Sequence, residues 1–294
     1  MGKVVVIGSG PAGVSAALYT ARARMETVVF TMGPGALGKA HEIENYYGFA
    51  EAVSGQELEQ AGIRGAERLG VSFLEEEVVG VYYLWEEEAF QVKTTKGSHR
   101  ADCVILATGT SRLDPPLPDL ETLVGKGVSY CAVCDGFFYR KKDVLVYGNG
   151  DYAVHEALEL KNLAKTVTIV TDGQPMRADV SEGIRVDTRK IAGLIATESF
   201  EGVRFEDGTT LEAQGLFIAY GIAGSAALAK KIGAVTEGNS IVVDEGMATN
   251  VPGLYAAGDC TGGMLQIAKA VYEGAKAGTE AVRFLRGREK MQHG

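Results

Sequence analysis

The first hydrophobic positions of the chain outline a strand, a tight turn, a helix and a second strand. Residues 4–7 are a short apolar run, and the glycine-rich segment GSGPAG follows at 8–13. A helical pattern then continues to about Arg24, and a second apolar run occupies 27–30. Short apolar runs between turn residues are typical of strands buried in a parallel sheet. This order predicts a dinucleotide-binding unit, because such units place a glycine turn between the first strand and its helix.

The same order of patterns returns in the middle of the chain. The apolar run 144–147 precedes the segment GNGDYA at 148–153, a helical pattern to about Leu163 and a further apolar run at 166–170. A repeated strand, glycine turn and helix indicates a second unit of the same kind.

Each unit also contains a closing strand and strands rich in β-branched and aromatic residues. Residues 104–109 (VILATG) close the first unit and residues 216–221 (LFIAYG) close the second. Period-two alternation within 78–94 predicts β-strands, and the Asp-Gly pair at 207–208 predicts a hairpin turn. We therefore expect an α/β fold with two Rossmann-like dinucleotide-binding domains, the second inserted in the first.

Proline marks the connection between the expected domains. The segment 111–118 contains three prolines and is predicted to be an extended hinge. We expect residues 1–114 to form the first part of one domain, 115–238 to form the inserted domain and 239–294 to complete the first domain.

The C-terminal part of the chain is predicted to return to the first domain. A strand is expected at 241–243, and a final helix is expected from about Leu265 to Leu285. Small residues along one face of this helix favour tight packing.

Length and composition exclude several classes of protein. The chain has 294 residues, of which 46% are hydrophobic and 23% charged, as in ordinary globular domains. Its net charge of −9 argues against a nucleic acid partner, and its apolar runs are too short to span a membrane. The first residues lead directly into a strand without a signal-peptide pattern, so we expect a cytoplasmic protein.

Two cysteines, separated by two other residues in a CxxC motif, stand in the segment CAVCDG at 131–136. A zinc site needs about four ligands, and no second pair of ligands accompanies Cys131 and Cys134. Incidental spacing is a further alternative. A redox-active dithiol is the favoured interpretation, because this spacing permits an internal disulfide. No metal site is expected, and Cys103 and Cys260, on or beside predicted buried strands, are expected to be inert.

These motifs, together with TNVPGLYAAGDC at 249–260, resemble the low-molecular-weight thioredoxin reductases. The resemblance covers essentially the whole chain and implies an FAD-binding homodimer in which the inserted domain carries the dithiol. It implies that Cys131 attacks the partner disulfide, that Cys134 lies next to the flavin and that Asp135 manages protons. The residues that it implies for FAD binding are Gly8, Gly10, Pro11, Ala12, Gly13, Asn45, Thr108, Gly109, Asp259, Gln266, Ile267 and Ala268.

The first glycine unit departs from the family at the adenine ribose. Thr31 stands at the end of the second strand, where an acidic residue is expected, and its hydroxyl is a weaker possible partner. The glycine turn itself is unchanged, so FAD binding is still expected.

The second glycine unit departs further. The arginines that hold the 2′-phosphate of NADPH are missing apart from Arg177, and Asn149 and Tyr152 place side chains where the family has small residues. Asp172 suits the ribose hydroxyls of NADH instead. The pattern resembles the members of the family that lack a nicotinamide site and take electrons from ferredoxin.

We therefore expect a thioredoxin reductase that passes electrons from reduced ferredoxin through FAD and the dithiol to thioredoxin or a similar small disulfide protein. An NADH-dependent reductase of the same fold and a flavin-bound redox sensor or electron carrier without turnover are the alternatives. The basic residues Arg140, Lys141 and Lys142 either attract an acidic partner protein or form a solvated loop.

Overall fold

A computed structural model describes residues 2–40, 42–109, 115, 117–130, 132–221, 224–238 and 240–293. The chain divides into two compact units, the first made of Met1–Ser111 with Gly224–Gly294 and the second of Arg112–Ala223. Each unit contains a five-stranded parallel sheet. The predicted fold class, two Rossmann-like domains, is confirmed.

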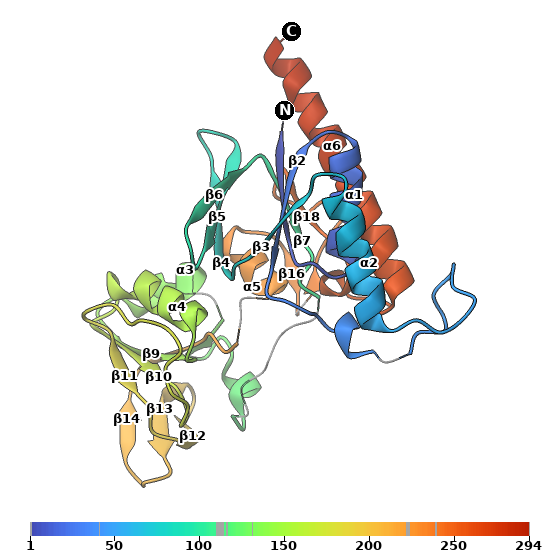
Figure 1. Ribbon diagram of the computed structural model, residues 1–294. Helices are drawn as coiled ribbons and strands as arrows, with labels where there is room; N and C mark the ends of the chain where they lie inside the picture. The colour runs from blue at the N-terminus through green and yellow to red at the C-terminus, as the bar shows by residue number, and fades with distance from the viewer. Residues whose placement is uncertain are drawn as a thin grey trace. The chain divides into compact units, whose positions relative to one another are not determined.

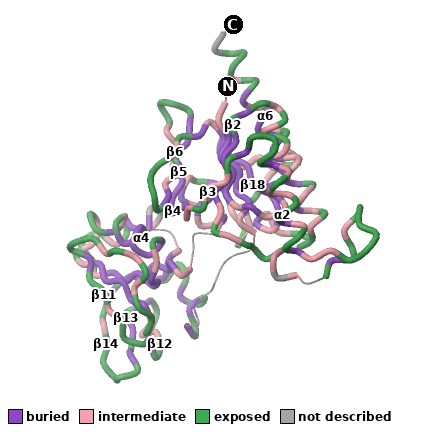
Figure 2. The backbone as a smooth tube through the Cα atoms, viewed as in Figure 1, coloured by how far each residue is buried: buried purple, intermediate pink, exposed green. Residues whose placement is uncertain are grey.

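The central sheet of the first unit has the strand order β18-β7-β1-β2-β3. Its strands are β1 (Lys3–Ile7), β2 (Glu26–Thr31), β3 (Ser72–Glu75), β7 (Cys103–Leu106) and β18 (Leu254–Ala256). Figure 2 shows the strands of this sheet largely buried apart from the edge strand β3, as the near-continuous apolar sequences of the other four predict.

Helices cover one face of this sheet and a smaller antiparallel sheet lies on the other (Figure 1). The helices of this layer are α1 (Pro11–Arg22), α2 (Gly55–Glu67) and α6 (Ile267–His293). Helix α5 (Ser225–Lys231) packs against the smaller sheet instead, and short 3₁₀ turns are η1 (Leu37–Lys39) and η4 (Asp259–Thr261). The smaller strands are β4 (Val78–Leu84), β5 (Ala89–Thr94) and β6 (Ser98–Ala101), and a separate pair is β16 (Thr236–Glu237) with β17 (Ser240–Ile241).

Helices α1 and α6 touch through their backbones. A Cβ atom added at Gly274 would lie 2.0 Å from the carbonyl oxygen of Ala12, and one added at Gly278 would lie 2.6 Å from that of Ala16. The small residues predicted along one face of the last helix therefore serve this close approach.

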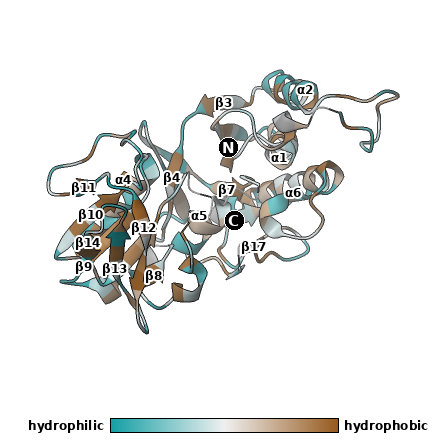
Figure 3. Cartoon of the chain, turned by 90° about the horizontal axis from the view of Figure 1, so that it is seen from below, coloured by the Kyte–Doolittle hydropathy of each residue, from teal (hydrophilic) through white to brown (hydrophobic). Residues whose placement is uncertain are grey.

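The second unit repeats the plan with the strand order β11-β10-β9-β15-β8. Its parallel strands are β8 (Val128–Ser129), β9 (Asp143–Tyr147), β10 (Thr166–Val170), β11 (Arg185–Asp187) and β15 (Gly215–Ile218). The antiparallel strands are β12 (Ile191–Ala196), β13 (Phe200–Phe205) and β14 (Thr210–Glu212), and the helices are α3 (Ala132–Asp135) and α4 (Asp151–Lys161), with 3₁₀ turns η2 (Leu120–Leu123) and η3 (Gly136–Tyr139). Figure 3 shows how hydrophobic the strands of this unit are.

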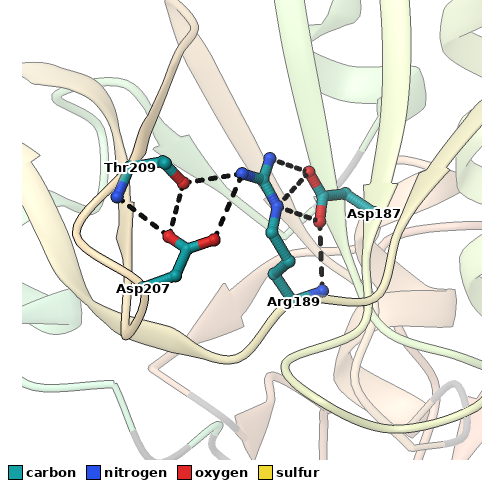
Figure 4. Close-up of polar contacts among 4 residues, drawn as sticks. All are labelled: Asp187, Arg189, Asp207 and Thr209. Carbon is teal, nitrogen blue, oxygen red and sulfur yellow. Dashed lines mark hydrogen bonds and ion pairs between the residues drawn. The ribbon is translucent and has the colours of Figure 1, made fainter.

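An arginine cluster joins the parallel strands of the second unit to its hairpin (Figure 4). Arg189 donates to both carboxylate oxygens of Asp187, at 3.0 Å and 2.5 Å, and to the hydroxyl of Thr209 at 2.6 Å. Its guanidinium carbon lies 3.9 Å from the centre of the Phe205 ring.

Several predicted boundaries differ from the structure. The final helix begins at Ile267 and continues to His293, because nothing after Leu285 except Gly287 opposes a helix. Of the strand predicted at 241–243, only Ile241 is paired in a strand. Most of the predicted hinge at 111–118 lies outside the described residues, so the hinge stays a prediction.

The end of the inserted unit also differs from the expected residue 238. The second unit ends at Ala223, and α5 belongs to the first unit. Leu228 and Ala229 of α5 are fully buried, and Lys231 donates to the backbone oxygen of Val79 at 3.2 Å. Packing of α5 against β4 therefore sets this boundary.

Candidate active site

The predicted flavin residues follow the carboxyl ends of neighbouring strands in the first unit. Gly8 follows β1, Thr108 follows β7 and Asp259 follows β18, and these three strands are adjacent in the sheet. Ligands of open parallel sheets bind at the carboxyl ends of the strands, where the strand order reverses. The topology therefore brings together residues that are far apart in sequence.

The glycine turn after β1 has no room for side chains at two of its positions. Gly8 has a φ of +110°, and a Cβ atom there would lie 2.3 Å from the carbonyl oxygen of Ala107. A Cβ atom at Gly13 would lie 1.9 Å from the carbonyl oxygen of Gly8. Gly10, in contrast, has open space within 4 Å of that position. The turn is thus packed on its inner side and open at Gly10.

This open position is also the start of helix α1. Gly10 is the N-cap residue, Pro11 is the first helical residue, and no side chain caps the first N–H groups. Uncapped N–H groups at a helix N-terminus bind phosphate, because both the donors and the helix dipole favour an anion. Ala12 and Gly13 stand in this first turn. The glycine turn therefore fits the pyrophosphate of FAD.

The turn that carries Asp259 lies beside the start of α1. Gly258 has a φ of +85°, and a Cβ atom there would lie 2.8 Å from the Cβ atom of Ala12. The carboxylate of Asp259 is half-buried and makes no hydrogen bond within the described part of the chain. It is therefore available to a hydroxyl of a ligand that lies on the glycine turn.

Two of the predicted flavin residues contact each other directly. The side-chain amide of Asn45 donates to the amide oxygen of Gln266 at 3.0 Å. Both side chains are exposed, and Ile267 and Ala268 follow directly as the first residues of α6. Gln266, Ile267 and Ala268 thus follow the Asp259 turn in sequence, and the hydrogen bond to Gln266 brings Asn45, 221 positions away, to the same group.

Thr108 is held by a serine that the sequence analysis did not identify. The hydroxyl groups of Thr108 and Ser225 lie 2.7 Å apart, and the Ser225 N–H donates to the Thr108 hydroxyl at 2.8 Å. Ser225 begins α5 and is 2% exposed. Gly109 has a φ of +72°, which lets the chain turn away after Thr108. A serine at a helix start after the closing strand is too common a pattern to have indicated this pair.

Thr31 does not present a free hydroxyl at the end of β2. Its Oγ1 lies 2.6 Å from the Oγ of Ser9, and it accepts a hydrogen bond from the Gly33 N–H at 3.1 Å. Thr31 therefore connects the second strand to the glycine turn.

The dithiol segment is described in part. Cys131 lies outside the described residues, and Cys134 lies in helix α3, next to Asp135. The Ser129 hydroxyl donates to a carboxylate oxygen of Asp135 at 2.6 Å. Ser129 ends strand β8 and is 4% exposed. A buried serine thus orients the acidic residue that follows the second cysteine.

A buried glutamate holds the start of the dithiol helix. Glu156 of α4 is 1% exposed and accepts a hydrogen bond from the Ala132 N–H at 3.0 Å. No sequence pattern indicated this role for Glu156, because it stands among ordinary helix-forming residues. Its neighbour His155 is also buried, as a structural role predicts.

The other two cysteines are buried in the first unit. Cys103 is fully buried, and burial raises the pKa of its thiol well above the ordinary range. Burial also raises the pKa of Cys260 to about 11. The prediction that both thiols are inert agrees with this burial.

Among the described residues, no helix has the length and apolar character needed to cross a bilayer. The same residues contain no cluster of three or more metal-ligating side chains.

Comparisons with known proteins agree with this geometry. The family model for pyridine nucleotide-disulphide oxidoreductases matches residues 2–274. A thioredoxin reductase of Streptomyces clavuligerus is 36% identical over 307 residues, which cover 96% of this chain and 94% of the relative.

Solved structures give the same result. The atypical thioredoxin reductase TRi from Desulfovibrio vulgaris Hildenborough has a TM-score of 0.91 and 44% identity, covering 98% of this chain and 99% of that one. A ferredoxin-flavin thioredoxin reductase from Clostridium acetobutylicum has a TM-score of 0.70 and 31% identity, covering 97% of this chain and 98% of that one. Together with the glycine turn that fits FAD, these matches show that the chain belongs to the pyridine nucleotide-disulphide oxidoreductases, as an FAD-binding disulfide oxidoreductase of the thioredoxin reductase family.

Proposed function

We propose that this enzyme takes electrons from reduced ferredoxin and passes them through FAD and the Cys131–Cys134 pair to thioredoxin or a similar small disulfide protein. The observation that carries the choice of donor is that the glycine turn of the second unit is hydrogen-bonded at Asn149 to the segment after β10.

Hydrogen bonds tie this glycine turn to the segment after β10. The Arg177 N–H donates to the backbone oxygen of Asn149 at 2.7 Å, and its guanidinium donates to the Asn149 side-chain oxygen at 2.9 Å. The Asn149 amide donates to the backbone oxygen of Pro175 at 3.2 Å. Arg177, the one family-like candidate for a 2′-phosphate, is therefore already engaged.

The adenosine half of a dinucleotide would lie between the glycine turn and the end of the second strand. There the Thr171 hydroxyl donates to the backbone oxygen of Gln174 at 2.5 Å, and the Gln174 N–H donates back to the Thr171 backbone at 3.1 Å. The segment is thus folded on itself next to the turn. This arrangement supports a donor that does not use the nucleotide site.

Asp172 is engaged as well, which weakens the case for NADH. One carboxylate oxygen accepts from the Tyr147 hydroxyl at 2.9 Å, and the other accepts from the Ile191 N–H at 2.8 Å. A ribose hydroxyl would have to compete with both bonds. NADPH faces the further cost of a phosphate near this carboxylate, on the order of 1–4 kcal/mol.

Tyr152, a large residue at the start of α4, is further evidence against a nucleotide in this unit, although weaker than the hydrogen bonds. Tyr152 is 4% exposed, so its ring occupies buried space at the first helical turn. Small residues at this position normally let the pyrophosphate approach the helix.

Two observations favour ferredoxin among donors that are not nucleotides. One is the similarity to the ferredoxin-flavin thioredoxin reductase of Clostridium acetobutylicum. The other is the exposed basic group Arg140, Lys141 and Lys142 directly after the dithiol segment, which suits an acidic protein partner. An otherwise acidic chain with a local basic group attracts such a partner at that group.

The thiols of Cys131 and Cys134 carry out the thiol–disulfide exchange with the partner protein. The Cys131 thiolate attacks one sulfur of the partner disulfide, and the other partner sulfur leaves with the electron pair of the broken bond and takes a proton. Cys134, as a thiolate, then attacks Cys131, which releases the second partner thiol and leaves the Cys131–Cys134 disulfide. Asp135, oriented by Ser129, accepts and returns the protons. When bound, FAD supplies the conversion of single electrons into the pair that restores the dithiol.

A flavin-bound sensor or electron carrier is the alternative from another class. A sensor or carrier of this kind does not require a dithiol. Here the helix after Cys131 is held by the buried Glu156, and Asp135 is oriented by Ser129, as disulfide exchange would require. By the resemblance to the thioredoxin reductases we propose that the enzyme is a homodimer, and we propose separately that it acts in the cytoplasm; sedimentation of the holoenzyme tests the dimer.

Anaerobic flavin spectroscopy tests the donor. The holoenzyme is mixed in turn with reduced ferredoxin, NADH and NADPH, and the loss of flavin absorbance is followed. We expect rapid bleaching with reduced ferredoxin only. Rapid bleaching by micromolar NADPH or NADH would overturn the proposal.

Variants of the two cysteines test the route beyond flavin. Cys131→Ser should abolish thioredoxin reduction while Cys134 still perturbs the flavin spectrum, because only the outer thiol attacks the partner. Cys134→Ser should leave flavin reduction by the donor intact and stop electron transfer to the disulfide. Turnover at the wild-type rate in either variant would contradict the assigned roles.

A further inference from the structure

The first turns of α6 carry a pair of opposite charges that the helix itself does not favour. Lys269 stands three residues into the helix, where a positive charge opposes the helix dipole. Glu273 follows four residues later, and the order lysine then glutamate is the weaker one for a pair within a helix. A role in tertiary structure therefore has to account for the two residues.

The Lys269 ammonium group binds three atoms of the turn that contains Asp259. It donates to the backbone oxygen of Gly258 at 2.8 Å, to that of Gly262 at 2.5 Å and to the Thr261 hydroxyl at 2.9 Å. The two backbone oxygens flank Asp259 on either side. One side chain thus fixes both ends of the turn.

Glu273 binds the same turn from the side of its N–H groups. One carboxylate oxygen accepts from the Gly258 N–H at 2.8 Å and from the Thr261 hydroxyl at 2.8 Å. The same oxygen lies 3.0 Å from the Lys269 nitrogen, and the two side chains are 14% and 12% exposed. Lysine, glutamate and turn form one largely buried network.

The burial of Lys269 and Glu273 carries a desolvation penalty, so a contribution to folding stability does not by itself explain the pair. Removing two charges from water is expensive, and apolar side chains of similar size often serve a fold equally well. A buried ion pair is best explained where it specifies one conformation. Here that conformation is the turn whose middle residue, Asp259, leaves its carboxylate without a partner among the described residues.

The turn also needs an exact position. Gly258 and Gly262 both have positive φ, at +85° and +77°, and Gly258 lies against Ala12 at the start of α1. The turn is therefore placed between the pyrophosphate turn and the helix that begins with Ile267 and Ala268.

We propose that Lys269 and Glu273 are positioning residues for FAD, which hold the Asp259 turn in its binding conformation before the cofactor arrives. Neither side chain needs to touch the flavin. The inference rests on the assignment of Asp259 to FAD and not on the identity of the electron donor. Preorganisation of this kind increases affinity, because the ordering cost is met during folding.

Cofactor titration tests the proposal. FAD is removed from the full-length protein and titrated back into Lys269→Met, Glu273→Gln and the double variant, well below their unfolding temperatures. We expect each single variant to weaken FAD binding by about tenfold or more, and the double variant to be no weaker than the worse single one. Glu273→Gln keeps an acceptor oxygen and tests the charge even if Lys269→Met does not fold.

Arg283→Met is the matched control, because Arg283 lies on the same helix and forms an ion pair with Glu280 while 73% exposed. Its Kd for FAD should stay within about twofold of wild type. A merely structural pair would lower the melting temperatures of the FAD-free and FAD-loaded proteins equally and leave the Kd unchanged, which would overturn the proposal. Asp259→Asn separates the two assignments. If it binds FAD as wild type does, the role of Asp259 fails, whereas weakened binding in Asp259→Asn alone refutes only the positioning role.

Discussion

At the scale of single residues, the chain separates reactive thiols from inert ones by burial. The Cys103 thiol donates to the backbone oxygen of Gly253 at 2.9 Å, and the Cys260 thiol donates to that of Ala257 at 3.3 Å. Both side chains are buried in the first unit, whereas the CxxC pair belongs to the second. Raised pKa values keep the buried sulfurs in the unreactive thiol form at neutral pH.

We predict that the reduced native enzyme alkylates at two cysteines only, Cys131 and Cys134. A pKa of about 11 means that the Cys260 thiolate is about 100-fold rarer at pH 8 than that of a thiol with a pKa of 9, and burial slows access further. Mass spectrometry after iodoacetamide treatment at pH 8, native and unfolded, measures this. All four cysteines should react in the unfolded protein, and labelling of Cys260 in the folded protein would contradict its burial.

Residues marked by a local sequence pattern were easier to predict than residues whose partners lie far away in the sequence. The strand and glycine pattern predicted Gly8, whereas the assignment of Asp259 came from the family resemblance and is supported by its place after a strand. The contact of Asn45 with Gln266 joins residues 221 positions apart, and no local pattern specifies it. Ser225 and Lys269 were missed for the same reason, since their partners are set by tertiary structure.

At the scale of elements, the contact between α1 and α6 carries the geometry of the flavin site. The first turn of α1 meets Gly274 on one side and the Asp259 turn on the other. Any displacement of α1 therefore also moves the expected pyrophosphate site.

We predict that Gly274→Ala destabilises the protein by about 1–3 kcal/mol and weakens FAD binding, because the new methyl group would overlap the Ala12 backbone. Gly287→Ala is the control on the same helix, since nothing lies within 4 Å of its added Cβ atom. It should be neutral or slightly stabilising, as alanine is a better helix former. Thermal unfolding and FAD titration measure both, and equal effects would argue against the close contact.

The arginine cluster of the second unit predicts a dependence of stability on pH. Hydrogen bonds from Arg189 lower the pKa of Asp187, so the stability from this pair is complete above the ordinary aspartate pKa and is lost as pH falls through the lowered value. Arg189→Met should lower the melting temperature by a few degrees at pH 7, and this difference should shrink towards pH 3. Lys165→Met, which removes an exposed ion pair with Asp143 in the same unit, should change it much less. A difference that is as large at pH 3 as at pH 7 would contradict the ion pair.

At the scale of the whole molecule, two five-stranded parallel sheets of similar plan have different roles. The glycine turns of both units are open at their middle glycine, Gly10 and Gly150, but that of the second is also tied to the segment after β10 through Asn149 and Arg177. Comparison of the second glycine turn with the family pattern predicted, from Asn149 and Tyr152, that a nucleotide would be obstructed there. It did not predict that the chain itself would supply the bonds, because the loop after β10 has no regular pattern.

Removal of FAD should therefore destabilise one unit selectively. Ligand binding stabilises the folded state by RT ln(1 + [L]/Kd), about 4 kcal/mol at 1,000 times the Kd. Calorimetry of the FAD-loaded and FAD-free proteins should show a lower melting temperature for the first unit and little change for the second. Hydrogen exchange at α1 and at β9 identifies which unit melts, and an equal loss of protection in both would contradict the assignment.

The edge strand beside β15 is the first strand of its sheet to be synthesised, whereas the edge strand beside β7 is the last of its sheet. This difference sets an order in which the two sheets can be completed during translation. Strand β8, which completes the second sheet beside β15, is synthesised before the rest of that sheet. Strand β18, which completes the first sheet beside β7, comes from the last fifth of the chain. The inserted unit can therefore fold during translation, while β7 waits with an unpaired edge until Leu254–Ala256 emerges. We therefore expect flavin to bind only after β18 and the Asp259 turn have left the ribosome, and nascent chains that stall before β18 should expose an aggregation-prone edge of β7.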